Sequence, residues 1–170
     1  MIKFAAHENY ICRNYAHRNS AYTLIELLVG ITIMALIFSI GFVSYRDFSR
    51  KQALTGVTKG LISDLRLIQQ KALAGEKIGS CTTLNGYKIN ISSSSYSLYA
   101  SCASDILLKT VDLTVNEVTL TLTPPIPTNT ITFKVLGQGT DLTSEETIRI
   151  TNSKINKTST VVVGIGGDVQ

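Results

Sequence analysis

One stretch of this chain limits its fold more than any other. Residues 22–43, YTLIELLVGITIMALIFSIGFV, contain a single charged residue, Glu26. A helix of that length is about 33 Å long, which matches the hydrocarbon core of a bilayer, and the stretch therefore predicts a membrane-spanning helix. A buried core helix of a soluble protein is the alternative. A secretory signal peptide fits poorly, because its apolar region would be shorter and small residues would follow it at a cleavage site.

The composition of the chain agrees with a membrane segment. Charged residues make up 16% of the 170 residues and hydrophobic residues 44%, and the mean hydropathy is +0.20. Soluble domains usually carry more charge. The net charge of +4 is too small to indicate nucleic-acid binding by itself. Basic residues occur both before and after the span, so the charge distribution leaves its orientation open.

The residues after the span have the spacing of an amphipathic helix. Apolar side chains recur three or four positions apart and form one stripe: Leu54, Val57, Leu61, Leu65, Ile68 and Ala72. Charged residues such as Asp64 and Lys71 are expected to lie largely off this stripe. No proline occurs between residues 22 and 75, and Gly75 is a suitable helix terminator. We therefore expect one continuous helix of about 50 residues.

From residue 80 onward the pattern is that of β-strands. Short runs rich in Val, Ile and Thr are separated by Gly, Pro, Asn and Asp, over residues 87–91, 96–101, 117–123, 130–136, 146–151 and 159–165. The apolar face of this sheet would pack on the helical stripe. The expected fold class is α+β: a long N-terminal helix, first transmembrane and then amphipathic, packed on a C-terminal antiparallel β-sheet domain.

A resemblance to a known family is carried by residues 21–36, AYTLIELLVGITIMAL. A small residue, an aromatic residue and T-L-I-E ahead of an unbroken apolar helix resemble the class III signal of type IV prepilins and type II secretion pseudopilins. The resemblance implies that a prepilin peptidase removes residues 1–21 by cutting between Ala21 and Tyr22, and that the new Tyr22 amine is methylated. Glu26 matches the acidic position of the family. Two residues depart from the usual pattern, since Ala21 stands where the family has Gly and Tyr22 where it has Phe.

The same resemblance implies a division of the chain. Residues 1–21 would be the leader peptide, 22–43 the transmembrane and assembly segment, 44–76 the amphipathic half of the long helix, and 77–170 the β-rich globular pilin domain. Residues 53–78 look like the second half of the long helix in H-type minor pseudopilins and their fimbrial relatives, and the C-terminal strands resemble theirs by pattern.

The function implied by the resemblance is that of a minor pilin or pseudopilin, a structural subunit of a type IV pilus or a type II secretion pseudopilus. Its implied partners are other pilin or pseudopilin subunits, the prepilin peptidase, the inner-membrane assembly platform and, before assembly, membrane lipid. The protein would cross the cytoplasmic (inner) membrane once, with a cytoplasmic leader and an extracytoplasmic C-terminal domain, and would then enter the filament.

Two alternatives remain open. DNA-uptake relatives carry arginines near the C-terminal glycine turn, but residues 158–170 contain no Lys or Arg, so nucleic acid is not the expected partner. An unrelated single-pass protein with an anchored β domain would need no cleavage after Ala21.

Catalysis has little support in the sequence. The two histidines, His7 and His17, lie in the leader, so the mature chain would have none for a Ser–His or Cys–His arrangement. The adjacent carboxylates Glu145 and Glu146 would point to opposite faces of a strand or lie in a loop, and a solvated turn is the favoured interpretation. We therefore expect neither an enzyme nor a cofactor.

Cys81 and Cys102 bracket the predicted hairpin of residues 87–101. In an oxidising extracytoplasmic setting they are expected to form a disulfide that closes a loop. Metal binding is the alternative, but two cysteines with no nearby histidine make a poor site, so no metal is expected. Cys12 lies in the leader and would leave an even number of cysteines in the mature chain.

Glu26 is the residue for which the sequence supports the most specific functional hypothesis. A carboxylate inside an apolar span is costly unless it is paired. After cleavage, the amine of Tyr22 in a neighbouring, staggered subunit could pair with Glu26 and neutralise both charges. The alternative is that Glu26 rests among lipid headgroups without a partner.

Overall fold

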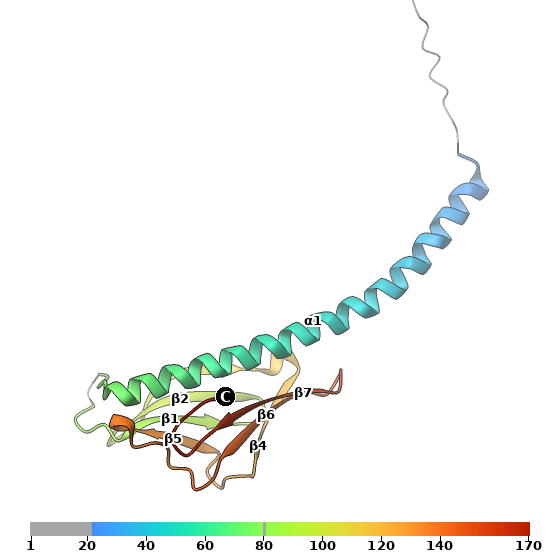
Figure 1. The fold of residues 1–170 in the computed structure, drawn as a ribbon. Coiled ribbons are helices and arrows are strands. Elements are labelled where there is room, and N and C mark those ends of the chain that lie inside the picture. Colours follow the sequence, from blue (N-terminus) through green and yellow to red (C-terminus); the bar gives the residue numbers. More distant parts are fainter. Residues whose placement is uncertain (1–21, 80) are drawn as a thin grey trace, which may run out of the picture. The chain divides into compact units, whose positions relative to one another are not determined.

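The computed structural model describes residues 22–79 and 81–170. Its internal contacts divide the chain into two units, the first ending at Gly41 and the second beginning at Phe42. Helix α1 (Leu24–Ala74) starts in the first unit and ends in the second, and all the described strands belong to the second. The continuous helix expected from the sequence is therefore confirmed (Figure 1).

The C-terminal end of α1 is closed by its glycine. Gly75 has a φ of +63°, a left-handed conformation that glycine adopts without strain. Its N–H donates to the Ala72 carbonyl at 3.1 Å, and the N–H of Glu76 donates to the Lys71 carbonyl at 3.2 Å. This is the Schellman arrangement, which satisfies carbonyls that the end of a helix would otherwise leave unpaired.

The strands form two antiparallel sheets. The described strands are β1 (Gly86–Ile91), β2 (Ser95–Ser101), β3 (Ile106–Asp112), β4 (Val118–Thr123), β5 (Thr130–Lys134), β6 (Glu146–Asn152) and β7 (Lys157–Val163). The first sheet has the order β3-β2-β1-β5 and the second the order β4-β6-β7. Every pair is antiparallel, as the alternating pattern predicts.

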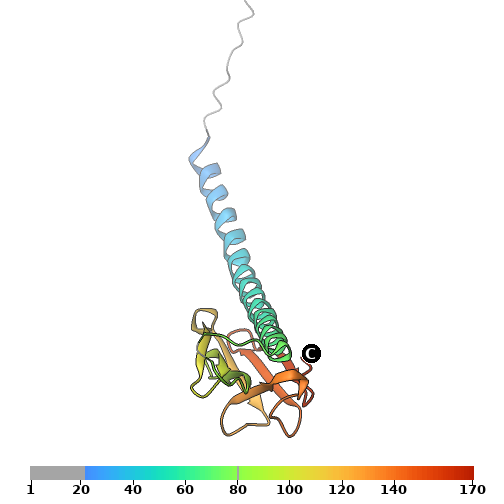
Figure 2. The same cartoon turned by 90° about the vertical axis from the view of Figure 1, so that its left-hand side faces the viewer.

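The core of the second unit lies between the C-terminal part of α1 and both sheets (Figures 1 and 2). Within the stripe expected from the sequence, the fully buried side chains are Leu61, Leu65, Ile68 and Ala72, while Leu54 is also buried and Val57 partly so. They pack with inward-facing side chains of both sheets, among them Tyr87, Ile89, Leu98, Ile131, Phe133, Ile148, Ile150, Val161 and Val163. The amphipathic reading of this part of the chain is correct.

The segment around Thr140 joins the two sheets. Thr140 is buried, and it forms an isolated bridge with Phe133 of β5. Its N–H and its hydroxyl both donate to the Ile165 carbonyl, at 2.8 and 3.0 Å, just after β7 ends. Backbone groups that would be costly to leave unpaired in the interior are satisfied in this way.

The observed strands differ from the expected ones in three places. Strand β3 was not expected; it is an edge strand with mostly half-buried or exposed residues, so it lacks a clean alternation of apolar and polar positions. Residues 135–137 form a short 3₁₀ turn rather than the end of β5. The last strand ends at Val163, and the glycines that follow form a turn in which the Gly167 N–H donates to the Gly164 carbonyl at 3.0 Å.

Candidate functional site

The N-terminal end of α1 is held by a side-chain cap. Thr23 precedes the helix, and its hydroxyl oxygen accepts a hydrogen bond from the Glu26 N–H at 3.3 Å. Thr23 and Glu26 thus stand at the first and last positions of a T-x-x-E capping box, a motif that starts helices. The carboxylate also lies in the first turn, where the helix dipole favours negative charge. The spacing of Thr23 and Glu26 in the sequence by itself indicates this local role.

Large apolar side chains in the first half of α1 are exposed. One helix in the described residues is long and apolar enough to cross a membrane, with a mean hydropathy of 2.4 over its most apolar 18-residue window. None of that window is buried. Leu24, Ile25 and Phe38, for example, are each more than 70% exposed. This exposure differs from what a core helix of a soluble protein would show, because a core helix is covered by the rest of its chain.

The predicted cleavage site is only partly within the described residues. Ala21 lies outside them, and so do residues 1–20 of the predicted leader with both histidines and Cys12. Tyr22 is described and is 77% exposed. The roles of Ala21, Tyr22 and Glu26 in cleavage, methylation and assembly stay predictions.

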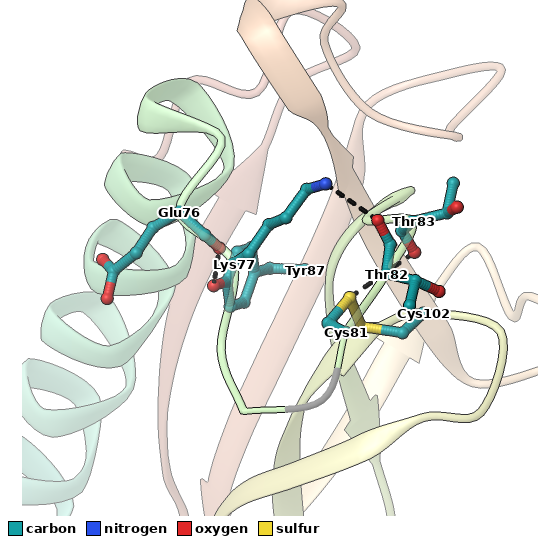
Figure 3. The surroundings of a disulfide bond; sticks show 7 residues. All are labelled: Glu76, Lys77, Cys81, Thr82, Thr83, Tyr87 and Cys102. Carbon is teal, nitrogen blue, oxygen red and sulfur yellow. Dashed lines mark hydrogen bonds between the residues drawn. A yellow bond between two sulfur atoms is a disulfide. The ribbon is translucent and has the colours of Figure 1, made fainter.

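Cys81 and Cys102 form a disulfide, as expected, with Cα atoms 5.7 Å apart (Figure 3). Cys81 lies in the connection between α1 and β1, and Cys102 directly follows β2. Among the described residues, no three His, Cys, Asp or Glu side chains come together in a way that could hold a metal ion.

The connection between α1 and β1 is held by two further contacts near this disulfide. The Tyr87 hydroxyl donates to the Glu76 carbonyl at 2.6 Å, and the Lys77 ammonium donates to the Thr82 carbonyl at 2.8 Å (Figure 3). Burial raises the pKa of Tyr87, so this hydroxyl keeps its proton and remains a donor. The end of α1 is thereby fixed to the first sheet.

A buried carboxylate on α1 corrects the expectation for Asp64. Asp64 is only 6% exposed, although the sequence pattern placed it largely off the buried stripe. Its carboxylate accepts a hydrogen bond from the Tyr96 hydroxyl at 2.8 Å and forms an ion pair with the Lys109 ammonium at 2.8 Å. Tyr96 lies on β2 and Lys109 on β3, so this contact ties the edge of the first sheet to the helix. Helical periodicity could not reveal it, because both partners are distant in sequence.

A groove of about 460 Å³ opens along α1 beside Asp64. Gly56 and Gly60 line it, and a Cβ atom added at either position would meet nothing within 4 Å. The two glycines cost helix stability, roughly 1 kcal/mol each relative to alanine. No contact inside the described molecule requires them.

Glu146 also departs from its expected position in a solvated turn. It is the first residue of β6 and points into the interior with 1% of its surface exposed, while its neighbour Glu145 is exposed. One carboxylate oxygen of Glu146 has no hydrogen-bond partner among the described residues. Burial raises the pKa of this carboxyl, and the backbone N–H of Thr123 opposes that shift.

These features define a class of protein. A long apolar N-terminal helix, exposed in its first half and packed against antiparallel sheets in its second, is the α+β arrangement of pilin-like proteins. Residues 16–42 match the family model of the prokaryotic N-terminal methylation motif, the motif of type IV pilins and pseudopilins. Comparison of the chain with curated proteins and with solved structures finds no match.

Proposed function

We propose that this chain is a minor pilin or pseudopilin, a structural subunit of a type IV pilus or a type II secretion pseudopilus. The observation that carries the proposal is the methylation motif of residues 16–42, which ends within α1, in the half of this helix whose most apolar window is not buried by the described chain. Such a helix needs an apolar surrounding, either lipid or the helices of other subunits. The role is structural rather than catalytic.

Processing creates the group with which Glu26 would pair. Prepilin peptidase would cut between Ala21 and Tyr22, and methylation of the new amine leaves its positive charge in place. A positive charge at the N-terminal end of α1 is unfavourable against the helix dipole, and an acidic residue in the first turn offsets it. In the filament, the Glu26 carboxylate of one subunit would pair with the Tyr22 amine of its neighbour.

Assembly exchanges lipid around the helix for other helices. Burying apolar area gives little net gain in this exchange, because lipid tails are as apolar as the side chains they surround. Close packing and charge pairing must therefore supply the preference for the filament. Leaving one partner of a buried ion pair unpaired typically costs about 3–5 kcal/mol, so loss of Glu26 should act on incorporation more than on membrane insertion.

The variant Glu26→Gln tests this proposal, with Glu145→Gln as the matched control. Glutamine also suits the last position of a capping box, so the start of α1 should be kept while the charge is lost. Glu145 is exposed on a loop, and its replacement makes the same change in charge. The measurement is the ratio of filament-associated to membrane-bound protein at equal expression, together with sequencing of the mature N-terminus.

We expect both variants and the wild type to begin at Tyr22, and only Glu26→Gln to show a reduced ratio. An unchanged ratio would refute the pairing mechanism. An intact Met1 terminus in cells that contain the peptidase would refute the pilin assignment and favour an unrelated single-pass anchored β domain.

DNA uptake remains the second candidate within the family, but no cation occurs in residues 158–170, the region in which DNA-uptake relatives carry theirs. Other pilin or pseudopilin subunits and the inner-membrane assembly platform are the partners that we propose. Before assembly, the subunit would reside in the cytoplasmic membrane with its β domain on the extracytoplasmic side.

A further inference from the structure

A second groove in the unit of residues 42–170 is lined by positive charge. It has a volume of about 370 Å³ and lies between residues 51–59 of α1 and the start of β7. Leu54 and Thr58, both buried, line it from the helix. Its other lining residues are Lys51, Thr55, Lys59, Lys157, Thr158 and Ser159.

The lysines of this groove differ from several others in the chain. Lys71, Lys88 and Lys109 each form an ion pair with a carboxylate. Lys51, Lys59 and Lys157 are exposed, form no ion pair with the described residues, and share a groove that no acidic residue lines. The groove therefore carries three positive charges that no carboxylate of the described residues pairs with.

The chemistry of the lining favours a phosphate group. Lysine binds phosphate as a point charge, and hydroxyl groups can donate to its remaining oxygens. The Ser159 hydroxyl forms no hydrogen bond with the described residues, so it is available as a donor. The hydroxyls of Thr55 and Thr58 already donate to helix carbonyls at 3.0 and 2.8 Å, so these two hydroxyls can only accept hydrogen bonds from a ligand.

We infer that this groove, hereafter the lysine groove, binds the phosphate of an anionic phospholipid headgroup at the membrane surface. The inference rests on the proposed membrane insertion of α1, and it adds a specific lipid contact to it. The predicted span ends at Val43, and Lys51 follows eight residues later, which is about 12 Å of helix. The headgroup layer adds about 5–8 Å beyond the hydrocarbon core, and a lysine side chain can extend toward it.

The residues between the span and the lysine groove support this choice of ligand. Phe42, Tyr45 and Phe48 are each more than half exposed, and the Arg46 guanidinium lies 5.9 Å from the centre of the Phe42 ring. Exposed aromatic side chains combined with basic ones are typical of the interface between membrane and water. The field of an anionic surface falls off within a Debye length of about 8–10 Å, so it also acts on lysines that lie beyond the headgroup layer.

The first test measures lysine reactivity in the full wild-type chain. The protein is placed in nanodiscs of phosphatidylcholine alone or of phosphatidylcholine with phosphatidylglycerol, labelled with an acylating reagent, and analysed by mass spectrometry. We expect phosphatidylglycerol to protect Lys51, Lys59 and Lys157 severalfold, while Lys77 and Lys134 react equally in both discs. Equal labelling of the groove lysines in both discs would overturn the inference.

Further arms of the same experiment separate the sources of phosphate. Inorganic phosphate or a DNA duplex is added to discs of phosphatidylcholine alone. Protection by either of these, without protection by phosphatidylglycerol, would assign the lysine groove to a soluble anion or to nucleic acid and would overturn the lipid assignment. Protection by phosphatidylglycerol that weakens as salt is added is the expected result.

The second test compares two double variants with the same loss of charge. Lys59→Gln with Lys157→Gln alters both walls of the groove, and Lys77→Gln with Lys134→Gln alters lysines outside it. Full-length protein in detergent is titrated with phosphatidylglycerol or phosphatidylcholine, and bound lipid is measured by native mass spectrometry. Each lysine near an anionic surface contributes a several-fold gain in affinity, so the groove variant should bind phosphatidylglycerol about 10- to 30-fold more weakly.

Equal affinity of the two double variants for phosphatidylglycerol would overturn the inference. The labelling experiment uses wild-type protein, so it decides the question even if the groove variant unfolds. Neither test depends on filament incorporation. A chain that binds phosphatidylglycerol in this groove but never enters a filament would refute the proposed function and leave the lipid site intact.

Discussion

Replacing Asp64 with alanine would break the contact between α1 and the edge of the first sheet. The Tyr96 hydroxyl would lose its acceptor at 2.8 Å, and Lys109 would lose its ion-pair partner. Tyr96 is 3% exposed, and Asp64 is the acceptor of its hydroxyl among the described residues. The substitution therefore leaves a buried polar group unsatisfied, which is one of the few changes that destabilise a domain strongly.

The two losses differ in size. A buried hydroxyl without a partner costs about 1–3 kcal/mol. The ion pair adds less than about 1 kcal/mol, because half of the Lys109 side chain is exposed and solvent screens the interaction. The orphaned hydroxyl thus accounts for most of an expected loss of about 3 kcal/mol, which corresponds to a decrease in Tm of about 10 °C for a domain of this size.

The assay is thermal unfolding of the full-length protein in detergent, followed by circular dichroism. Asp105→Ala is the matched control, because Asp105 pairs with Lys88 at the surface and its loss should cost at most about 1 kcal/mol. Tyr96→Phe completes a double-mutant cycle with Asp64→Ala. If the reasoning holds, Tyr96→Phe restores part of the stability lost in Asp64→Ala, because it removes the orphaned hydroxyl. Equal effects of Asp64→Ala and Asp105→Ala would refute it.

The same contact has a pH signature. Burial, followed by the hydrogen bond to Asp64 and the charge of Asp64, raises the pKa of Tyr96 above its ordinary value of 10.0. The folded chain then holds this proton at pH values at which the unfolded chain releases it, so stability falls as the pH rises above about 10. Ultraviolet titration of the phenol should show a lower pKa for Tyr96 in Asp64→Asn. An unchanged pKa would contradict the role of Asp64 in this network.

Three further predictions concern stability. Replacing Cys81 and Cys102 with serine should lower the free energy of unfolding by about 3 kcal/mol, because the disulfide joins residues 21 positions apart and so restricts the unfolded chain. Denaturant unfolding would measure this loss. A loss below about 1 kcal/mol would show that the disulfide adds little to the other contacts of this connection. Glu146→Gln should stabilise the domain at neutral pH by roughly 1 kcal/mol, because it removes a carboxylate that burial disfavours. Because folding raises the pKa of Glu146, the stability of the wild type should fall as the pH rises from the unfolded-state pKa to the folded-state pKa of this carboxyl. The glutamine variant should lack this pH dependence. Parallel pH profiles of stability for the two proteins would contradict the prediction. Gly60→Ala should raise the Tm by an amount equivalent to about 1 kcal/mol, because its Cβ would meet nothing within 4 Å, and a lower Tm would show that the site cannot take a methyl group.

Most of the fold could be predicted because the sequence expresses it locally. The continuous helix follows from the absence of proline and from the spacing of its apolar residues, and Gly75 marks its end. The alternating pattern predicted every described strand except β3. None of the residues of β3 is fully buried, and apolar residues stand next to one another in its sequence ILLKTVD, so period-2 patterning cannot detect it.

The side-chain contacts that distinguish this domain could not be predicted in the same way. Asp64 and Glu146 are charged residues, for which the default expectation is exposure. The two buried carboxylates differ in their partners. Asp64 contacts Tyr96 and Lys109, whereas one oxygen of Glu146 has no partner among the described residues. Neither relation is encoded in the spacing of neighbouring residues, because each arises only when elements distant in sequence are brought together.

Some features of the chain are not explained by contacts within the described residues, and these features indicate its function. The exposed apolar side chains of α1 and the glycines at 56 and 60 each cost the isolated chain something, since they gain nothing from its own core. Glu26 is different, because its position after Thr23 already gives it a local role in starting the helix. A glutamine would serve that local role equally well, so a loss of assembly in Glu26→Gln can be assigned to the charge alone. The capping contact thereby makes Glu26 a sharper test of charge pairing than it would be in a helix without a cap.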